Sequence, residues 1–398
     1  MDILLRDLNP EDIAWIKKKT NVAVSQNKFI KSLISEARKK ENLQLVRKSN
    51  NEDSNTSFSF IDLFAGIGGF RSALTFLGGN CVFTNEWNKY AITTYKNWYG
   101  DEESTNDLDI RNFNHSLIPN HDVLCAGFPC QPFSLAGVSK KNSLGRKHGF
   151  EDADQGNLFD CIMHIVDAKK PPILFLENVK NLKSHDKGNT WKHIHNEISS
   201  RGYEIFSKVI DASYWVPQHR ERIFIVCFDK SLFCKNRTVN FEFPEIPKER
   251  EYSLSSFLEK KPDKKYMLSD KLWNYLQNYA EKHRLKGNGF GYGLVGKDGK
   301  TRTMSARYYK DGAEILIKQK GWKNPRRLTP NEAKYLMGFH DKYAKCFGHQ
   351  NGFPQVVSNT QSYKQFGNSV VPIVVEKIMI QIIKEINSYR QDLNLDAA

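Results

Sequence analysis

Five short apolar runs, separated by segments of helical pattern, constrain the fold of this chain more than any other feature. The runs are FSFIDLF, CVFTNEW, DVLCAGF, ILFLENV and RIFIVCF, and FRSALTFL and AITTYKNWY among them have the spacing of amphipathic helices. Strands that are apolar on both faces belong to a parallel sheet covered by helices on both sides. We therefore expect an α/β fold whose ligands bind at the carboxyl ends of the strands.

The chain of 398 residues is longer than one ordinary domain and divides into four parts. These are residues 1–50, the alternating α/β part 58–230, a turn-rich part 231–325 with no strong period, and an ordered part 326–398. The last part contains LTPNEAKYLMGF, in which Thr329 and Glu332 are spaced as a capping box. Pro330 and Gly338 mark the start and the end of that helix.

Positive charge is concentrated in two parts of the chain, which has a net charge of +14. Residues 231–330 carry 22 basic and 11 acidic side chains, and residues 1–50 carry 11 basic and 6 acidic ones. Tryptophan, tyrosine and phenylalanine are interleaved with the basic residues of the first block, and no amphipathic helix of the length needed at a bilayer surface is evident there. This combination favours nucleic acid over a membrane as the partner.

Seven scattered cysteines without a CxxC pair indicate free thiols rather than disulfides or a zinc site. His193 and His195 are expected on an exposed helix face, and no metal is predicted. We find no signal peptide and no apolar run of transmembrane length, so we expect a soluble, cytoplasmic protein.

The N-terminal part reads as a short strand, ILLRDL, followed by two helices, the first with Asn9 as N-cap and Pro10 at its first position. This pattern resembles the ribbon-helix-helix type of DNA-binding module, in which paired strands enter a groove. A small packing or dimerisation appendage explains the same pattern, and both interpretations stay open. The polar segment NNEDSNTS at 50–57 is expected to be a linker.

Three successive strand ends indicate a cofactor that contains adenosine. DLFAGIGGF places glycines in a strand-to-helix turn, where a ligand can approach the backbone without meeting a Cβ. Glu86 ends the next strand, where a carboxylate can accept hydrogen bonds from ribose hydroxyls, and Trp87 offers a flat face to a purine. Asp109 and Ile110 follow at the third strand end, as one acceptor and one apolar wall for adenine.

Cys130 lies just beyond the fourth strand end, between Pro129 and Pro132, which stiffen the loop and place the thiol in the ligand crevice. A nucleophilic cysteine requires such fixed geometry and positive surroundings. Glu177 is expected at the next strand end, and Arg220 and Arg222 start the last apolar run. Thiol, carboxylate and guanidinium groups on one crevice indicate an active site. Cys125 and Cys161, by contrast, lie within apolar runs and are expected to be core thiols.

The ordered motifs of the chain resemble those of the cytosine-5 DNA methyltransferase family. They are IDLFAGIGGF, NEW, GFPCQPFS, GNLFD, ENVKNL, QHRER, RRLTPNEAKYLMGF and QFGNSVVP, in residues 58–230 and 326–380. The resemblance implies a Rossmann-like methyltransferase sheet in a catalytic domain of residues 58–230, with 326–398 returning to it and a target recognition domain at 231–325. It also implies S-adenosylmethionine as cofactor, held by Phe64, Gly66, Gly68, Gly69, Glu86, Trp87, Asp109, Ile110, Pro129, Leu158, Asn368 and Ser369.

The family resemblance also implies roles for the catalytic residues. Cys130 would add to C6 of a cytosine, Glu177 would meet charge at N3, Arg222 would hold O2, and Arg220 would support the site. The cytosine must first be flipped out of duplex DNA. The polar segment that follows the nucleophile is expected to form a mobile lid over the flipped base, with DNA contacts from Ser134, Lys140, Lys141 and Arg146.

The segments GFGYG and TRTMSARYYKDGAEILI resemble the Dcm-like branch of the family, which implies the inner cytosine of a CCWGG or CCNGG site. Arg302 and Arg307 are the candidate guanine readers, because arginine matches guanine O6 and N7. We expect a monomeric catalytic unit, with dimerisation through residues 1–50 still open. A cognate restriction endonuclease would act on the same DNA site without a stable complex. The alternatives are a tRNA cytosine-5 methyltransferase and a DNA-binding regulator without catalysis.

Overall fold

The computed structural model describes residues 58–100, 105–129, 157–234, 238–249 and 251–395, all within the unit that spans 54–398. The predicted N-terminal module at 1–50 therefore lies outside the described residues. The same holds for Cys130 and for the segment that follows it as far as residue 156.

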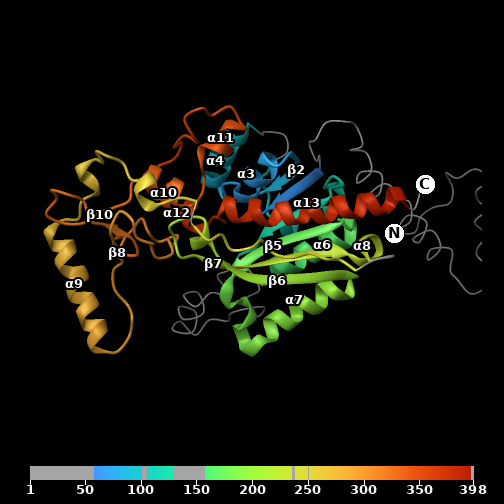
Figure 1. Ribbon diagram of the computed structural model, residues 1–398, viewed down its shortest axis with the longest axis horizontal. Coiled ribbons are helices and arrows are strands. Elements are labelled where there is room, and N and C mark those ends of the chain that lie inside the picture. The colour runs from blue at the N-terminus through green and yellow to red at the C-terminus, as the bar shows by residue number, and fades with distance from the viewer. Residues whose placement is uncertain (1–57, 101–104, 130–156, 235–237, 250, 396–398) are drawn as a thin grey trace, which may run out of the picture. The chain divides into compact units, whose positions relative to one another are not determined.

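A seven-stranded sheet in the order β3-β2-β1-β4-β5-β7-β6 forms the centre of the described chain (Figure 1). Its strands are β1 (Phe58–Leu63), β2 (Gly79–Asn85), β3 (Thr105–Asn106), β4 (Val123–Gly127), β5 (Ile173–Val179), β6 (Tyr203–Asp211) and β7 (Glu221–Asp229). The first five are parallel, as the sequence predicts. The α/β class is therefore confirmed.

The wholly parallel sheet expected from the sequence is wrong at one place, because β7 runs antiparallel to both β5 and β6. Strand β6 was not predicted, because only two of its nine residues are buried and it has no apolar run. This edge strand precedes β7 with only a short connection, so the two strands pair as antiparallel neighbours. β7 thus enters the sheet between β5 and β6 from the opposite direction.

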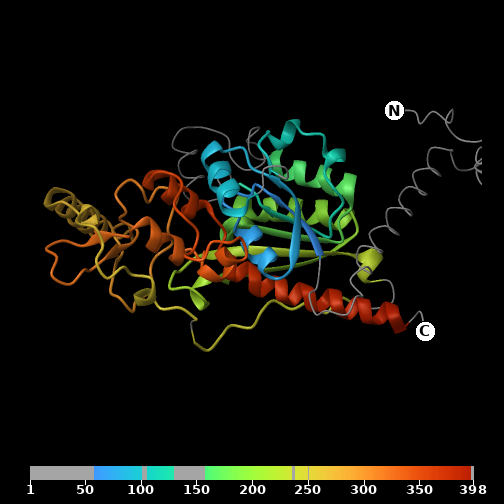
Figure 2. The same ribbon diagram turned by 90° about the horizontal axis from the view of Figure 1, so that it is seen from above.

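Helices cover both faces of this sheet. They are α3 (Gly69–Phe76), α4 (Lys89–Tyr99), α6 (Asn157–Lys169), α7 (Asn189–Ser200), α8 (Lys230–Phe233) and α13 (Pro372–Leu395). Figure 2 shows α13, in red, along one side of the sheet and the green helices α6 and α7 on the other. The predicted helices within 69–76 and 89–99 are confirmed.

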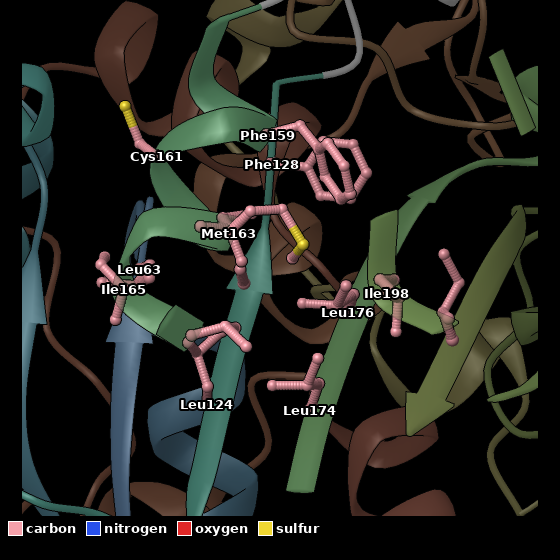
Figure 3. Close-up of a cluster of buried hydrophobic side chains, with 14 of the residues drawn as sticks. Leu63, Leu124, Phe128, Phe159, Cys161, Met163, Ile165, Leu174, Leu176 and Ile198 are labelled. Carbon is pink, nitrogen blue, oxygen red and sulfur yellow. The ribbon is translucent and has the colours of Figure 1, made fainter. Parts of the chain in front are cut away.

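A large hydrophobic core cluster lies between the sheet and helices α6 and α7 (Figure 3). Leu63, Leu124 and Leu176 project from three strands toward Phe159 and Ile165 of α6. Each buried side chain of this size contributes about 1.5–3 kcal/mol, so this layer holds the strand ends, and any site on them, in fixed positions.

The predicted core thiols and exposed histidines are placed as expected. Cys125 is fully buried in β4 and Cys161 is buried in α6. His193 and His195 are exposed on α7. These cysteines are therefore part of the packing of the sheet.

Residues 251–327 contain a second sheet and a helix that the sequence did not predict. The sheet has the order β10-β9-β8, with β8 at Leu294–Val295, β9 at Leu316–Ile317 and β10 at Arg326–Arg327. The helix is α9 (Asp270–Leu285), capped by Ser269, whose side chain accepts a hydrogen bond from Leu272 N. The prediction of an irregular segment is therefore wrong for these residues. The helix could not be recognised in the sequence because Leu276 is its one buried residue, so α9 has no apolar period.

The last part of the chain returns to the large sheet through α10 (Pro330–Leu336), α11 (Asp341–Lys345), α12 (Asn359–Asn368) and α13, which packs against α3. The predicted capping box of Thr329 and Glu332 is present, and Gly338 follows the helix with φ 85°. The sequence was expected to contain no apolar run of transmembrane length. Within the described residues, the stretch Asn359–Tyr389 could nevertheless cross a membrane by its length and composition. However, 67% of its most apolar window is buried, as in the core helix of a folded domain.

Candidate active site

A cavity of about 1030 Å³ opens at the carboxyl ends of the parallel strands. Thirteen predicted site residues line it, namely Phe64, Gly66, Glu86, Trp87, Asp109, Ile110, Pro129, Leu158, Glu177, Arg220, Arg222, Arg307 and Asn368. Gly68, Gly69, Ser369 and Arg302 do not line it. Cys130, Ser134, Lys140, Lys141 and Arg146 lie outside the described residues. The location agrees with the rule for ligands of open α/β sheets.

The glycine turn after β1 has two parts. Gly66 brings the backbone to the cavity, whereas Gly68 and Gly69 pack against other elements. Gly66 has φ 57°, and a Cβ there would meet nothing within 4 Å. A Cβ on Gly68 would lie 2.4 Å from the Tyr99 ring, and one on Gly69 would lie 2.5 Å from Val370 Cγ1. Close packing accounts for the lack of a side chain at the last two glycines, and their role in holding the cofactor stays a prediction.

Glu86 is held rigidly at the end of β2. Its Oε2 accepts a hydrogen bond from Gly66 N at 2.8 Å, and its Oε1 accepts one from Asn88 N at 2.7 Å. Burial raises the pKa of this carboxyl, while the two backbone donors oppose that rise. Each oxygen keeps a lone pair for a ligand on the cavity side, so the carboxylate is preorganised to accept hydroxyl groups.

Asp109 has a cationic partner, Arg111, that was not predicted from the sequence. The Nη2 atom of Arg111 lies 2.5 Å from Asp109 Oδ2, and the same guanidinium lies 5.8 Å from the centre of the Trp87 ring. The side-chain hydrogen bonds from Arg111 lower the pKa of Asp109. Asp109 also caps the short helix Ile110–Asn112. In the sequence, the one indication of the ion pair is that Asp109 and Arg111 are two residues apart.

The residues around Glu86 fit an adenosine-containing cofactor. Trp87 is 65% exposed beside the carboxylate, and Ile110 and Leu158 are buried apolar walls of the same cavity. The open space at Gly66 admits a ligand close to the backbone. Fixed acceptor, flat ring, apolar walls and open backbone are the features that such a group requires.

Glu177 and Arg222 form an ion pair on neighbouring strands. Val179 pairs with Arg222 in the β5–β7 register, so Glu177 lies two residues along on the same face. Arg222 Nε is 3.1 Å from Glu177 Oε1, and Arg222 Nη1 donates to Glu221 O at 2.8 Å. Burial raises the pKa of Glu177, although Arg222 and, more weakly, Arg220 act in the opposite direction. The carboxyl therefore retains a proton to a higher pH than an exposed glutamate does.

Arg220 directs its guanidinium toward backbone carbonyls. It is 2% exposed, and its Nη1 donates to Met304 O at 3.0 Å. Its Nη2 donates to Gly367 O at 3.0 Å and to Ser369 O at 2.8 Å. Arg220 thus joins the start of β7 to two distant segments of the cavity wall. Ser369 supplies a backbone carbonyl to this junction, while its hydroxyl donates to Val370 O.

Several residues that complete the site could not be read from single motifs. Gln218 is fully buried, donates to Leu336 O at 3.2 Å and accepts from Met304 N at 2.9 Å. Gln361 and Lys364 line the cavity from α12, and Lys364 Nζ lies 4.9 Å from the centre of the Tyr309 ring. Gln361 and Lys364 lie seven and four residues before Asn368 on one helix, which places all three on the same helix face. That spacing could have indicated from the sequence that they share a site.

This strand order and this cavity define the chain as an α/β protein with a ligand site at the carboxyl ends of its parallel strands. A model of the C-5 cytosine-specific DNA methylase family matches residues 58–384, and the chain belongs to that family of enzymes.

Two relatives and one solved structure show the extent of the similarity. The chain is 45% identical over 384 residues to the DNA-cytosine methyltransferase of Escherichia coli strain K12, which covers 84% of this chain and 80% of the relative. It is 45% identical over 329 residues to Type II methyltransferase M.NlaX of Neisseria lactamica, covering 82% and 96%. The structure of Entamoeba histolytica methyltransferase EhMeth superposes with a TM-score of 0.63 at 20% identity, covering 83% of this chain and 99% of that one.

Proposed function

We propose that this DNA cytosine-5 methyltransferase uses S-adenosylmethionine and acts on a cytosine flipped out of the duplex. The cofactor would supply an electrophilic methyl group on a sulfonium centre. The residues that would hold it are Phe64, Gly66, Glu86, Trp87, Asp109, Ile110, Pro129, Leu158 and Asn368, which all line one cavity. Gly68, Gly69 and Ser369 would act indirectly, by fixing the backbone behind that wall.

The observation that carries the mechanism is the Glu177–Arg222 pair in the same cavity as Glu86. Cytosine C5 is a poor nucleophile until a thiolate adds to C6 and the electron pair of the C5–C6 double bond moves toward C4 and N3. The thiolate would come from Cys130, which directly follows the cavity residue Pro129. Glu177, whose pKa is raised by burial, would hold a proton at N3, and Arg222 would donate to O2.

The remaining steps restore the aromatic ring. C5, now an enamine carbon, would take the methyl group as the bond from that methyl to the sulfonium sulfur breaks and leaves a neutral thioether. A base would then remove the C5 proton, and the C5–H electron pair would re-form the C5–C6 double bond as the C6–sulfur bond breaks to release the thiolate. Arg220, with three carbonyl acceptors, would act as a positioning residue for this wall rather than touch the base.

We infer that the target is the inner cytosine of CCWGG or CCNGG. The support is the resemblance of GFGYG and TRTMSARYYKDGAEILI to the Dcm-like branch. Arg302 and Arg307 remain the candidate guanine readers, and both are exposed. Arg307 lines the cavity, whereas Arg302 donates to Gly291 O at 3.1 Å. Bisulfite sequencing of DNA from a host that expresses this chain tests the site, and methylation outside CCNGG contexts contradicts it.

We assign residues 58–230 to the catalytic domain, 231–325 to target recognition and 326–398 to a segment that completes the catalytic domain. The support is helix α9 with strands β8 and β9 in the second range, and the packing of α13 against α3 in the third. Strand β10, at the start of the third range, pairs with β9 and joins the two ranges. Residues 1–50 would bind DNA as a regulator or dimerise the chain. Loss of promoter binding on deletion of that part, in a gel-shift assay, is the expected result for a regulator.

We further propose that the enzyme works in the cytoplasm as a monomeric catalytic unit of a type II restriction-modification system. Its endonuclease would act on the same DNA site without a stable complex. Transfer of a labelled methyl group to duplex DNA and to tRNA distinguishes this proposal from the tRNA alternative. We expect transfer to the duplex only, and Cys130→Ala should abolish it while leaving cofactor binding intact. Transfer to tRNA alone contradicts the proposal.

A further inference from the structure

Helix α9, with its C-cap Lys286, presents one face of exposed lysine and tyrosine side chains. With about 100° between successive residues, Lys271, Tyr275, Tyr279, Lys282 and Lys286 fall within a strip about 80° wide. All five are exposed, with Tyr275 at 58% and Tyr279 at 38%. Across the described residues, none of the three lysines has an ion-pair partner.

Acidic side chains of α9 lie away from this basic face. Asp270 and Glu281 are centred about 130° from the middle of the strip. Each is neutralised locally, since Lys323 Nζ lies 2.6 Å from Asp270 Oδ2 and Arg284 Nη2 lies 2.6 Å from Glu281 Oε1. The strip therefore carries three uncompensated positive charges and no carboxylate.

A neighbouring face of α9 anchors the helix to the small core. Leu276 is buried with Leu268 and Leu316, and Leu272 and Trp273 pack against that cluster. On the exposed side the rings of Tyr275 and Tyr279 lie 6.1 Å apart, and Tyr279 lies 4.3 Å from His283. The tyrosine side chains are thus held in a row along the helix, with their hydroxyls available as donors.

We propose that this face of α9 binds the phosphate backbone of duplex DNA outside the methylated site. Lysine and tyrosine are both donors to phosphate oxygens, and such contacts add affinity without reading bases. In Figure 1 and Figure 2, α9 stands at the end of the recognition segment away from the seven-stranded sheet. On this proposal, a duplex whose target base enters the cavity contacts α9 with base pairs outside its recognition sequence. This inference rests on the proposed function and adds a flanking contact to it.

The test compares duplexes of about 12 and about 40 base pairs, both centred on the same CCNGG site, since each base pair adds about 3.4 Å. The triple variant Lys271→Gln, Lys282→Gln, Lys286→Gln should bind the long duplex more weakly and reduce its salt slope by about 2.7. Binding to the short duplex and the preference for the site should not change. The matched control is Lys192→Gln, Lys208→Gln, Lys384→Gln, which removes three exposed lysines around the large sheet.

Three outcomes overturn the inference. They are unchanged binding of the long duplex, an equal loss on both duplexes, and an equal loss in the control variant, which would indicate net charge alone. Methylation of the short duplex by the native chain is measured in parallel. If that methylation is absent, the proposed function fails, whatever the affinity measurements show.

Discussion

Replacing Arg220 by glutamine tests whether the cavity wall depends on the three carbonyl contacts of this side chain. Glutamine is too short to reach all of the acceptors, so the carbonyls of Met304, Gly367 and Ser369 lose their guanidinium donors inside the protein. Each buried carbonyl left without a donor costs about 1–3 kcal/mol. If the amide recovers one contact, two carbonyls remain unpaired, and the free energy of unfolding should fall by about 2–6 kcal/mol.

The control is Arg302→Gln, which makes the same chemical change at an exposed arginine with one carbonyl contact. Its free energy of unfolding should stay within about 0.5 kcal/mol of the native value. Urea unfolding of both variants, followed by fluorescence, measures the difference. A loss of less than about 1 kcal/mol in Arg220→Gln refutes the reasoning. In the folded variant, kcat should fall more than cofactor affinity, because Arg220 joins the walls around Glu177 and Arg222.

Other predictions concern single titratable groups. Because burial raises the pKa of Glu177, single-turnover methylation should fall as pH rises through that pKa. Glu177→Gln should be about 10²–10⁴-fold slower and lack this dependence, and an unchanged pH profile in rapid-quench experiments contradicts the assignment. Glu86→Gln places an amide N–H against the N–H of Gly66 or Asn88, so the variant should bind the cofactor about tenfold or more weakly in calorimetry. A variant that binds the cofactor as tightly as the native chain argues against this site. Burial lowers the pKa of His121 from 6.5 to about 4. As pH falls from 6.5, the unfolded chain binds a proton at this histidine before the folded chain does. The free energy of unfolding should therefore fall by about 3 kcal/mol between pH 6.5 and pH 4. Acid unfolding of His121→Gln should show less of this loss.

The sequence predicted the strands that are buried on both faces, because continuous apolar runs such as β4 and β5 have few alternative structures. It did not predict β6 or the direction of β7. An edge strand with mostly half-buried side chains lacks an apolar pattern, and strand direction depends on the partner rather than on local residues. Helix α9 was missed for a similar reason, since a nearly isolated helix has only a narrow apolar stripe.

For the site, the sequence identified the side chains but not all of their contacts. The strand-end rule brought Glu86 and Glu177 to one cavity. Arg222 stands at the start of β7 and reaches the same cavity because β7 is antiparallel to β5, which the sequence did not predict. The contact between Arg222 and Glu177 depends on the β5–β7 register, and the three acceptors of Arg220 lie on segments far away in the sequence. Gly66 and Gly68 look alike in the sequence, and only the position of the Tyr99 ring shows which of them is a packing glycine.

A duplex that carries 5-fluorocytosine at the target position tests the central claim most directly. Once the thiolate has added to C6 and C5 has received the methyl group, fluorine cannot leave as a proton does, so elimination stops. The proposed mechanism predicts a denaturant-stable complex of one chain and one duplex that contains the labelled methyl group, with no such complex from Cys130→Ala. If the native chain methylates ordinary cytosine in the same duplex yet forms no complex with the fluorinated one, the covalent mechanism is contradicted.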